Sequence, residues 1–200
     1  MLTGTQLVGS NPARGRVLND YYATSPEATI KFLDSFIADE KLVAANLDIL
    51  EPAVGGGHIA DVLKEHFWNS TIDVADLVDR GYPGTKEQNF LLDNIEGTWD
   101  LVITNPPFKN VNEFIYKALE VSERYVVIFA KLQLLESKSR YILFNSTPFK
   151  SVYVHSSRVQ VYPNGKEVNE NGKPWASPMA FAWFVWDKEY DGIPTVHFIK

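Results

Sequence analysis

Short apolar runs alternate with amphipathic segments along most of the 200-residue chain. After Ser25 and Pro26, which suit the start of a helix, apolar residues recur at 30, 33 and 37, the spacing of one helix face. Residues 125–130 (YVVIFA) form instead a continuous apolar run, typical of a strand buried on both faces. The pattern predicts strands at 46–50, 71–75, 100–104, 125–130, 151–161, 179–186 and 195–199, and helices after Ser25, after Gly57, over 111–121 and over 132–144.

Strands that alternate with helices predict an α/β fold, with a mostly parallel seven-stranded sheet and helices on both of its faces. The last two strands have no helix between them, and their connection, residues 187–194, is short. We therefore expect the sheet to end in an antiparallel C-terminal hairpin. Residues 1–19 are rich in Gly, Asn, Ser and Arg, which predicts an irregular arm before a single domain over 20–200.

Composition narrows the possible chemistry. The chain has no cysteine, which excludes disulfides, zinc–cysteine sites and thiol nucleophiles, and its four histidines are scattered, so we expect no metal site. No apolar run is long enough to span a membrane, and the N-terminal residues lack the apolar core of a secretory signal. We therefore expect a cytoplasmic protein without a membrane association.

Charge is unevenly distributed. Residues 1–100 hold 7 Lys and Arg against 16 Asp and Glu, a balance of −9, whereas residues 101–200 hold 12 against 9, a balance of +3. The net charge of −6 argues against a nucleic-acid-binding protein, but residues 131–166 form a basic stretch with a single acid, Glu136. This stretch is either one positive face for an anionic partner or a chance cluster on a solvated surface.

A glycine-rich turn follows the first predicted strand of the sheet. Residues 51–57 read Glu-Pro-Ala-Val-Gly-Gly-Gly and lead directly into a helix, and Gly55, Gly57 and Ala60 also fit the dinucleotide pattern G-x-G-x-x-A. Glu51, at the strand end, would repel an anionic pyrophosphate. A cofactor with a cationic amino-acid end and no phosphate, such as S-adenosylmethionine, fits better, because backbone N–H groups at the helix start can hold its carboxylate.

A second acid is expected at the end of the next strand, where it would bind the ribose hydroxyls of the cofactor. Asp76 occupies that position, with Asp73 and Asp79 as nearby alternatives. Asp73 should point to the opposite side from Asp76, since side chains alternate along a strand.

The segment Asn105-Pro106-Pro107-Phe108 directly follows the strand predicted at 100–104. Two prolines end that strand and stiffen the loop at the carboxyl edge of the sheet, where open α/β sheets bind ligands. The Asn105 side-chain oxygen and the Pro106 carbonyl can then each accept one N–H of a conjugated amino group, which favours a nitrogen lone pair directed at a methyl group. Phe108 can stack on the target ring. These residues are the predicted catalytic site.

Together, Glu51–Gly57 and Asn105–Phe108 resemble the motifs of the amino-methyltransferase family of class I methyltransferases, in particular the DNA N6-adenine enzymes. The resemblance implies a Rossmann-like class I methyltransferase domain that uses S-adenosylmethionine. The segment 20–26 (DYYATSP) and the ending 180–187 (AFAWFVWD) resemble flanking segments of small phage- or prophage-type members. With Asp76, the predicted cofactor contacts in the turn, the catalytic motif and the flanking segments are Tyr22, Thr24, Glu51, Pro52, Ala53, Gly55, Gly57, Asn89, Phe90 and Asn105. Asn89 lies at a position where the family carries Asp.

One departure concerns the substrate. Related restriction-associated enzymes carry a large target-recognition domain, for which this chain has no room. We therefore expect loops and basic residues to bind the substrate. The candidate basic residues are Lys131, Arg140 and Arg158. The expected partner is DNA, with RNA adenine or a protein glutamine amide as alternative substrates because the Asn-Pro-Pro motif serves them too. An NAD-type oxidoreductase and a non-catalytic nucleic-acid-binding module are alternatives of another class.

Overall fold

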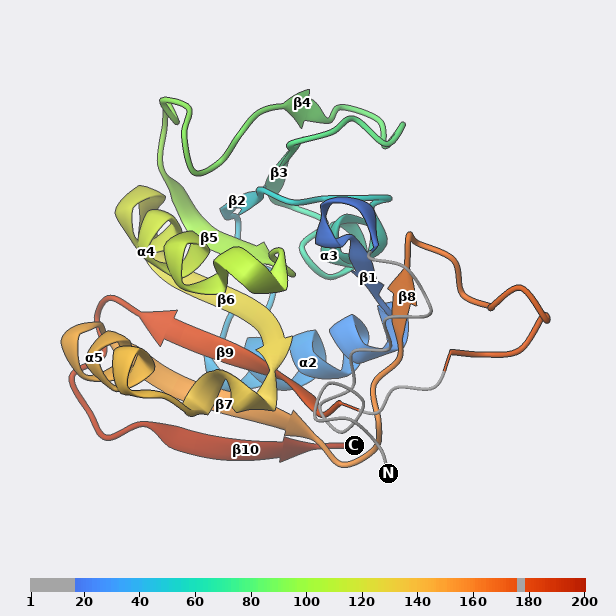
Figure 1. Ribbon diagram of the computed structural model, residues 1–200. Coiled ribbons are helices and arrows are strands. Elements are labelled where there is room, and N and C mark those ends of the chain that lie inside the picture. Colours follow the sequence, from blue (N-terminus) through green and yellow to red (C-terminus); the bar gives the residue numbers. More distant parts are fainter. Residues whose placement is uncertain (1–16, 176–178) are drawn as a thin grey trace.

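The computed structural model describes residues 17–175 and 179–200, and most of the expected N-terminal arm lies outside these residues. An eight-stranded mixed sheet forms the centre of the molecule, in the order β10-β7-β9-β6-β5-β2-β3-β4 (Figure 1). The strands are β2 (Asp48–Glu51), β3 (Thr71–Asp76), β4 (Lys86–Glu87), β5 (Trp99–Thr104), β6 (Ser122–Lys131), β7 (Phe149–His155), β9 (Phe181–Asp187) and β10 (Thr195–Ile199).

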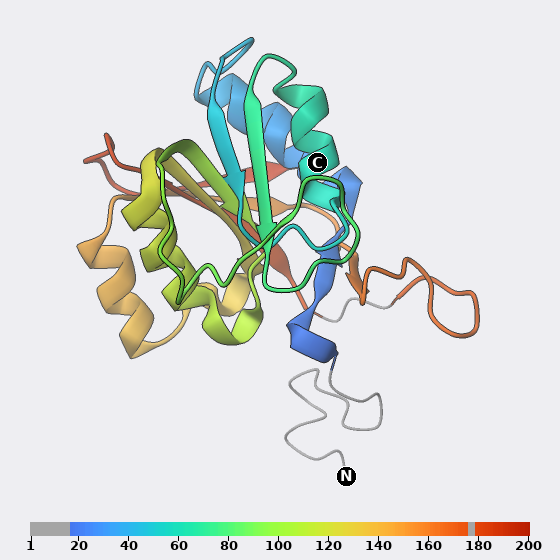
Figure 2. The ribbon, with the colours of Figure 1, turned by 90° about the horizontal axis from the view of Figure 1, so that it is seen from above.

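Helices cover both faces of the sheet, as the alternating pattern predicts (Figure 2). On one face α2 (Pro26–Asp39) and α3 (His58–His66) pack over a core that includes Phe32, Leu63 and Trp183. On the other face α4 (Val111–Val121) and α5 (Lys138–Ser146) pack over a second core that includes Ile115 and Trp186. Within the described ranges, none of these helices is long and apolar enough to cross a bilayer.

Two predicted elements are divided in the structure. The helix expected over 132–144 is a short 3₁₀ turn, Leu132–Leu135, followed by α5, and the break lies at Ser137, whose φ of 142° is incompatible with a helix. The strand expected over 151–161 ends at His155, and only its last residue, Val161, belongs to a second strand, β8 (Val161–Pro163). The expected count of seven strands in the sheet is wrong because β4 is two exposed, charged residues without an apolar signal.

The C-terminal strands differ from a simple hairpin. β9 and β10 run in opposite directions, as expected, but they are not neighbours. β7 lies between them, pairing antiparallel with β9 and parallel with β10. β9 is buried at every residue, so it needs a partner on both edges, and β6 and β7 supply them. A short connection therefore did not imply pairing of the two strands that it joins.

A separate two-stranded ribbon lies beside the main sheet. β1 (Tyr22–Thr24) pairs antiparallel with β8, with Thr24 opposite Val161 (Figure 1). The N–H of Ser25 donates to the carbonyl of Gln160 at the end of the ribbon, and the Ser25 side chain caps α2. β1 is thereby held between the first helix and the loop that follows β7.

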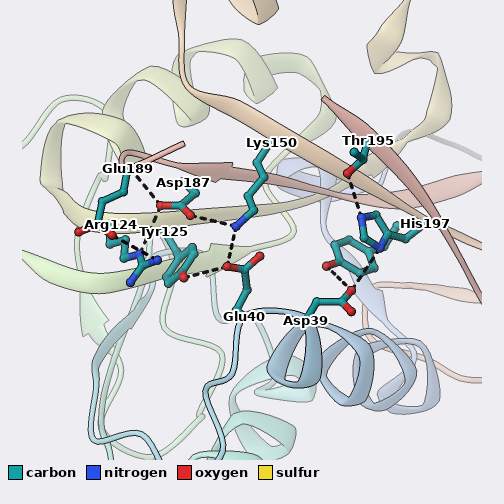
Figure 3. A network of polar contacts seen from close by, with 10 residues as sticks. Asp39, Glu40, Arg124, Tyr125, Lys150, Asp187, Glu189, Thr195 and His197 are labelled. Atoms are coloured by element: carbon teal, nitrogen blue, oxygen red, sulfur yellow. Dashed lines mark hydrogen bonds and ion pairs between the residues drawn. The ribbon is translucent and has the colours of Figure 1, made fainter. Parts of the chain in front are cut away.

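A polar network joins the end of α2 to the amino-terminal ends of β6 and β7 (Figure 3). Lys150 Nζ lies 2.6 Å from a carboxylate oxygen of Glu40 and 3.0 Å from one of Asp187. Burial alone raises the pKa of Asp187, but its bonds to Lys150, Glu189 and Arg124 lower it overall. The network lies at the amino-terminal ends of the parallel strands, whereas the carboxyl ends of β2, β3 and β5 lie at the opposite end of the sheet. Its role is therefore to hold the fold together.

Replacing Lys150 with methionine is expected to lower the free energy of unfolding by about 2 kcal/mol, because Glu40 and Asp187 are left as adjacent carboxylates with little access to water. Urea unfolding at pH 7 measures the loss. Lys117→Met is the matched control, since Lys117 pairs with the largely exposed Glu120 and should cost less than about 0.5 kcal/mol. Equal losses in the two variants would contradict the role given to the network.

Candidate active site

A cavity of about 300 Å³ opens at the carboxyl ends of β2, β3 and β5, where an open α/β sheet binds its ligand. Its walls come from β1, the two turns after β2 and β3, the segment 88–92, and the loop after β5. Ten of the residues predicted from the sequence line it: Tyr22, Thr24, Glu51, Pro52, Ala53, Asp76, Asn89, Phe90, Asn105 and Pro107.

Glu51 is the last residue of β2 and is almost fully buried, with 1% of its surface exposed. Its Oε2 atom has no hydrogen-bond partner among the described residues. Burial, followed by repulsion from Asp76, raises the pKa of the Glu51 carboxyl well above its usual range. A buried carboxyl with one unpaired oxygen at the wall of a cavity is suited to bind a cationic group, which would favour its ionised form.

Gly55 and Gly57 give the turn after β2 its shape and do not themselves line the cavity. Both have positive φ, 58° and 87°, and Gly57 forms the N-cap of α3. A side chain at Gly57 would collide with the ring of Tyr82, which lies about 2 Å from the position of a Cβ atom. The glycines are therefore needed for backbone conformation and for close packing around the turn.

Asp76 joins this turn to the end of β3. Its Oδ2 accepts the N–H of Gly55 at 2.8 Å, and its Oδ1 accepts the N–H of Val78 at 3.0 Å. The carboxylate faces the cavity and keeps lone pairs for further donors such as ribose hydroxyls. Asp73 instead accepts the indole N–H of Trp99, and Asp79 is exposed and accepts the N–H of Gly81, so neither alternative reaches the cavity.

Asn89 and Phe90 form the opposite wall. The Asn89 Oδ1 atom accepts the N–H groups of Leu91 and Leu92, at 3.1 and 3.3 Å, which leaves the amide nitrogen as the donor that this side chain offers. Phe90 is buried and packs against Phe114, with ring centroids 5.2 Å apart. The pair presents a polar edge beside an apolar surface, the combination that a purine ring needs.

Asn105 begins the loop after β5 and reaches across to β1. Its Nδ2 atom donates to the carbonyl oxygen of Tyr22 at 2.6 Å and to Oγ1 of Thr24 at 3.0 Å. Pro106 is buried, Pro107 lines the cavity, and all peptide bonds of the described residues are trans. Two residues of the predicted catalytic segment, Asn105 and Pro107, thus line the same cavity as Glu51.

Phe108 lies just outside the cavity lining, in contact with other aromatic groups. Its ring stacks on Tyr22, with centroids 5.4 Å apart, and lies 5.7 Å from the ring of Phe181. The ammonium of Lys131, the last residue of β6, lies 4.5 Å from the centre of the Phe108 ring. Lys131 is therefore the one of the three basic substrate candidates that the structure brings next to the predicted catalytic segment.

The other two basic candidates lie elsewhere. The Arg140 guanidinium, in α5, donates to the carbonyls of Gln133 and Glu136 in and just after the preceding 3₁₀ turn, and Arg158 is exposed in the loop between β7 and β8. Of the aromatic side chains near the basic stretch, Tyr153 is buried in the core, and Trp175 donates its indole N–H to the carbonyl of Lys166.

Sequence reasoning missed two residues of the site. The Tyr21 hydroxyl accepts the N–H of Gly56 at 2.9 Å, and its ring lies against Gly55, where an added Cβ would come within 2.4 Å. The guanidinium of Arg80 lies 4.2 Å from the centre of the Tyr21 ring, and both side chains line the cavity. Neither position has a local signal, since Tyr21 stands beside the more obvious Tyr22 and Arg80 stands in an irregular loop.

No protein-family model matches the chain, and no curated protein matches its sequence. Solved structures do match its fold. A protein from Pyrococcus horikoshii with a provisional assignment as an RNA methyltransferase superposes with a TM-score of 0.61 at 13% identity, over 94% of this chain and 99% of its own. Magnesium protoporphyrin IX methyltransferase from Synechocystis PCC 6803, with bound S-adenosylmethionine, gives 0.54 at 11% identity, over 82% and 79%.

A type I restriction-modification methyltransferase subunit from Streptococcus thermophilus also matches, with a TM-score of 0.57 at 10% identity. The match covers 86% of this chain but 45% of that subunit, so this chain spans less than half of its length. These likenesses confirm the predicted fold class. The chain has the Rossmann-like fold of class I methyltransferases, with the cavity at the carboxyl edge of its sheet.

Proposed function

We propose that the chain is an S-adenosylmethionine-dependent methyltransferase that methylates an exocyclic amino group, with adenine N6 in DNA as its substrate. The observation that carries this proposal is that a single cavity is lined by both Glu51, a buried carboxyl with an unpaired oxygen, and Asn105, the first residue of the Asn-Pro-Pro-Phe segment. The first fits a cationic cofactor and the second fits an amino substrate.

The residues around the cavity fit the parts of this cofactor. Glu51 would hold its ammonium, Asp76 its ribose hydroxyls, and Asn89 with Phe90 its adenine ring. When bound, the cofactor supplies an activated methyl group on a sulfonium. A dinucleotide would instead bring its pyrophosphate toward two buried acids, which disfavours the oxidoreductase alternative.

In such a reaction the residues of this protein bind and orient the target amine. The Asn105 oxygen and the Pro106 carbonyl accept the two N–H groups of the target amine, which localises the nitrogen lone pair and orients it. The rigid Pro106-Pro107 pair keeps these two acceptors in a constant relation. No strong base is needed before transfer, because the nitrogen becomes acidic once it carries the methyl group.

The choice of DNA is supported by the motifs of Glu51–Gly57 and Asn105–Phe108, which together resemble those of DNA N6-adenine enzymes, and by Lys131 beside Phe108. An ammonium at this place can contact a phosphate while the base enters the cavity. The similar solved structures include both an RNA-type and a restriction-type methyltransferase, so RNA and protein are tested beside DNA.

The test is transfer of a tritiated methyl group from S-adenosylmethionine to unmethylated DNA, to RNA and to a protein extract, in parallel. Label in DNA is expected, and label confined to RNA or to a glutamine amide would overturn the substrate assignment. Calorimetry separates the alternative classes, since S-adenosylmethionine should bind and NAD should not. Binding of NAD alone would overturn the cofactor assignment.

A further inference from the structure

The side-chain amide of Asn105 is held by β1 through both of its donors. We propose that the Tyr22 carbonyl and the Thr24 hydroxyl are positioning groups that turn this amide so that its oxygen alone faces the substrate, which makes the site select an amino group and reject a carbonyl. The inference rests on the proposed function for its substrate, but the orientation itself is a property of the free protein.

The hydrogen-bond chemistry determines which way the amide faces. A backbone carbonyl accepts and cannot donate, so the atom of Asn105 that lies 2.6 Å from the Tyr22 oxygen must be the NH₂ group. The same nitrogen lies 3.0 Å from Oγ1 of Thr24. An amide nitrogen carries two hydrogens, and these two acceptors use both of them, which leaves Oδ1 as the only polar atom of the side chain that is open to a ligand.

β1 is held firmly enough to impose this orientation. Thr24 is 1% exposed and pairs with Val161 of β8, while the adjacent Ser25 caps α2. On the other side of the loop, the N–H of Lys109 donates to the carboxylate of Asp20, just before β1. The Asn105 loop is therefore attached to the β1 segment at both ends.

The orientation has a consequence for substrate choice. An adenine amino group can donate to Oδ1, whereas a 6-oxo purine such as hypoxanthine would place a carbonyl oxygen against it, with no donor between the two acceptors. The same reasoning applies to aspartate at this position, because one of its carboxylate oxygens would face the Tyr22 carbonyl. In this chain the Asn105→Asp substitution is therefore expected to be poorly tolerated while the new carboxyl is ionised, although related enzymes use Asp in the motif.

The first test removes the Thr24 hydroxyl. Thr24→Val keeps the shape of the side chain, and kcat at saturating cofactor is expected to fall about tenfold, with a small change in the KM for DNA. Thr24→Ser restores an acceptor and should stay within about threefold of the wild type. Thr71→Val, an exposed threonine on β3, is the control for the substitution itself. A Thr24→Val variant that binds the cofactor more weakly but keeps its kcat would overturn the proposal.

The second test uses pH. Asn105→Asp should lose about 100-fold in kcat at pH 8 and recover as the pH falls toward the pKa of the new carboxyl, because a protonated carboxyl can again donate to the Tyr22 carbonyl. The wild type should lack this rise toward low pH. An Asn105→Asp variant as active as the wild type at pH 8 would contradict the orientation.

A spectroscopic readout makes the proposal independent of activity. The side-chain amide signals of Asn105 can be assigned in ¹⁵N–¹H spectra by their loss in Asn105→Asp, and both protons should be protected from exchange. In Thr24→Val one of the two should lose protection. Two protected protons in a protein that transfers no methyl group would refute the proposed function and keep the orientation, whereas unprotected protons in an active enzyme would refute the orientation alone.

Discussion

Replacing Asn105 with alanine is expected to lower kcat for methyl transfer about 1,000-fold, while the dissociation constant for S-adenosylmethionine changes by less than about threefold. The loss follows from the geometry of the loop after β5, where Asn105 lines the cavity and β1 occupies both donors of its amide, which leaves the amide oxygen for the substrate. Without it, one N–H of the target amine has no acceptor and its lone pair is no longer directed. Single-turnover transfer and calorimetry measure the two quantities separately.

Asn110→Ala is the matched control for this variant. Asn110 also lines the cavity, and its side chain makes no hydrogen bond that caps α4, so its loss should change kcat by less than about fivefold. Thermal unfolding of both variants checks that they are folded. Substantial transfer by Asn105→Ala would show that the chemistry does not depend on the Asn-Pro-Pro-Phe segment.

Replacing Glu51 with glutamine is expected to raise the dissociation constant for S-adenosylmethionine about 100-fold, since a buried carboxylate that pairs with a cation is lost. The free energy of unfolding of the cofactor-free protein should instead increase. Glu51 is buried beside Asp76, and glutamine removes the cost of keeping a carboxyl there. Calorimetry gives the affinity, and urea unfolding without cofactor gives the stability.

The pH dependence of the free energy of unfolding, measured without cofactor, should also report the ionisation of Glu51. Because the pKa of Glu51 is raised in the folded state, the folded protein keeps a proton that the unfolded chain releases near about pH 4.3. Between that pH and the folded pKa, the unfolded state binds fewer protons, so the free energy of unfolding falls as the pH rises. Glu51→Gln should remove this slope. Glu65→Gln, on the exposed side of α3, should leave the slope and the affinity unchanged.

A Glu51→Gln variant that binds the cofactor as tightly as the wild type would contradict the role given to this carboxyl. If Glu51→Gln increased the free energy of unfolding but left the affinity for S-adenosylmethionine unchanged, the buried acid would have a role other than binding the ammonium group of the cofactor. Weaker affinity in both Glu51→Gln and Glu65→Gln would point to a long-range effect of net charge instead.

Much of this fold is predictable from the sequence because its signals are local. The N-cap at Ser25, the apolar run at 125–130 and the paired prolines after β5 each specify a structure within a few residues. Three residues of the cavity wall are predictable for the same reason, since the carboxyl ends of parallel strands meet at one edge, and Glu51, Asp76 and Asn105 each lie at such an end.

The remaining features depend on contacts between distant segments. The bond from Asn105 to Tyr22 joins residues 83 positions apart, and no spacing rule indicates it. The place of β9 between β6 and β7 depends on which edges need a partner, and the short connection to β10 pointed to the wrong neighbour. The clustering of basic residues along the sequence also failed to indicate their roles. Lys131 contacts an aromatic ring, Arg140 binds backbone carbonyls, and Lys150 binds two acidic side chains, although all three belong to one basic stretch.

The central claim is that this cavity transfers a methyl group to an amino nitrogen in DNA, and nucleoside analysis tests it most directly. Unmethylated DNA is incubated with the protein and S-adenosylmethionine, digested to nucleosides and analysed by mass spectrometry. We predict N6-methyl-2′-deoxyadenosine with the wild type, and formation of the same nucleoside about 1,000-fold more slowly with Asn105→Ala. A methyl group found on carbon, or DNA that stays unmethylated while RNA or a protein amide is modified, would contradict it.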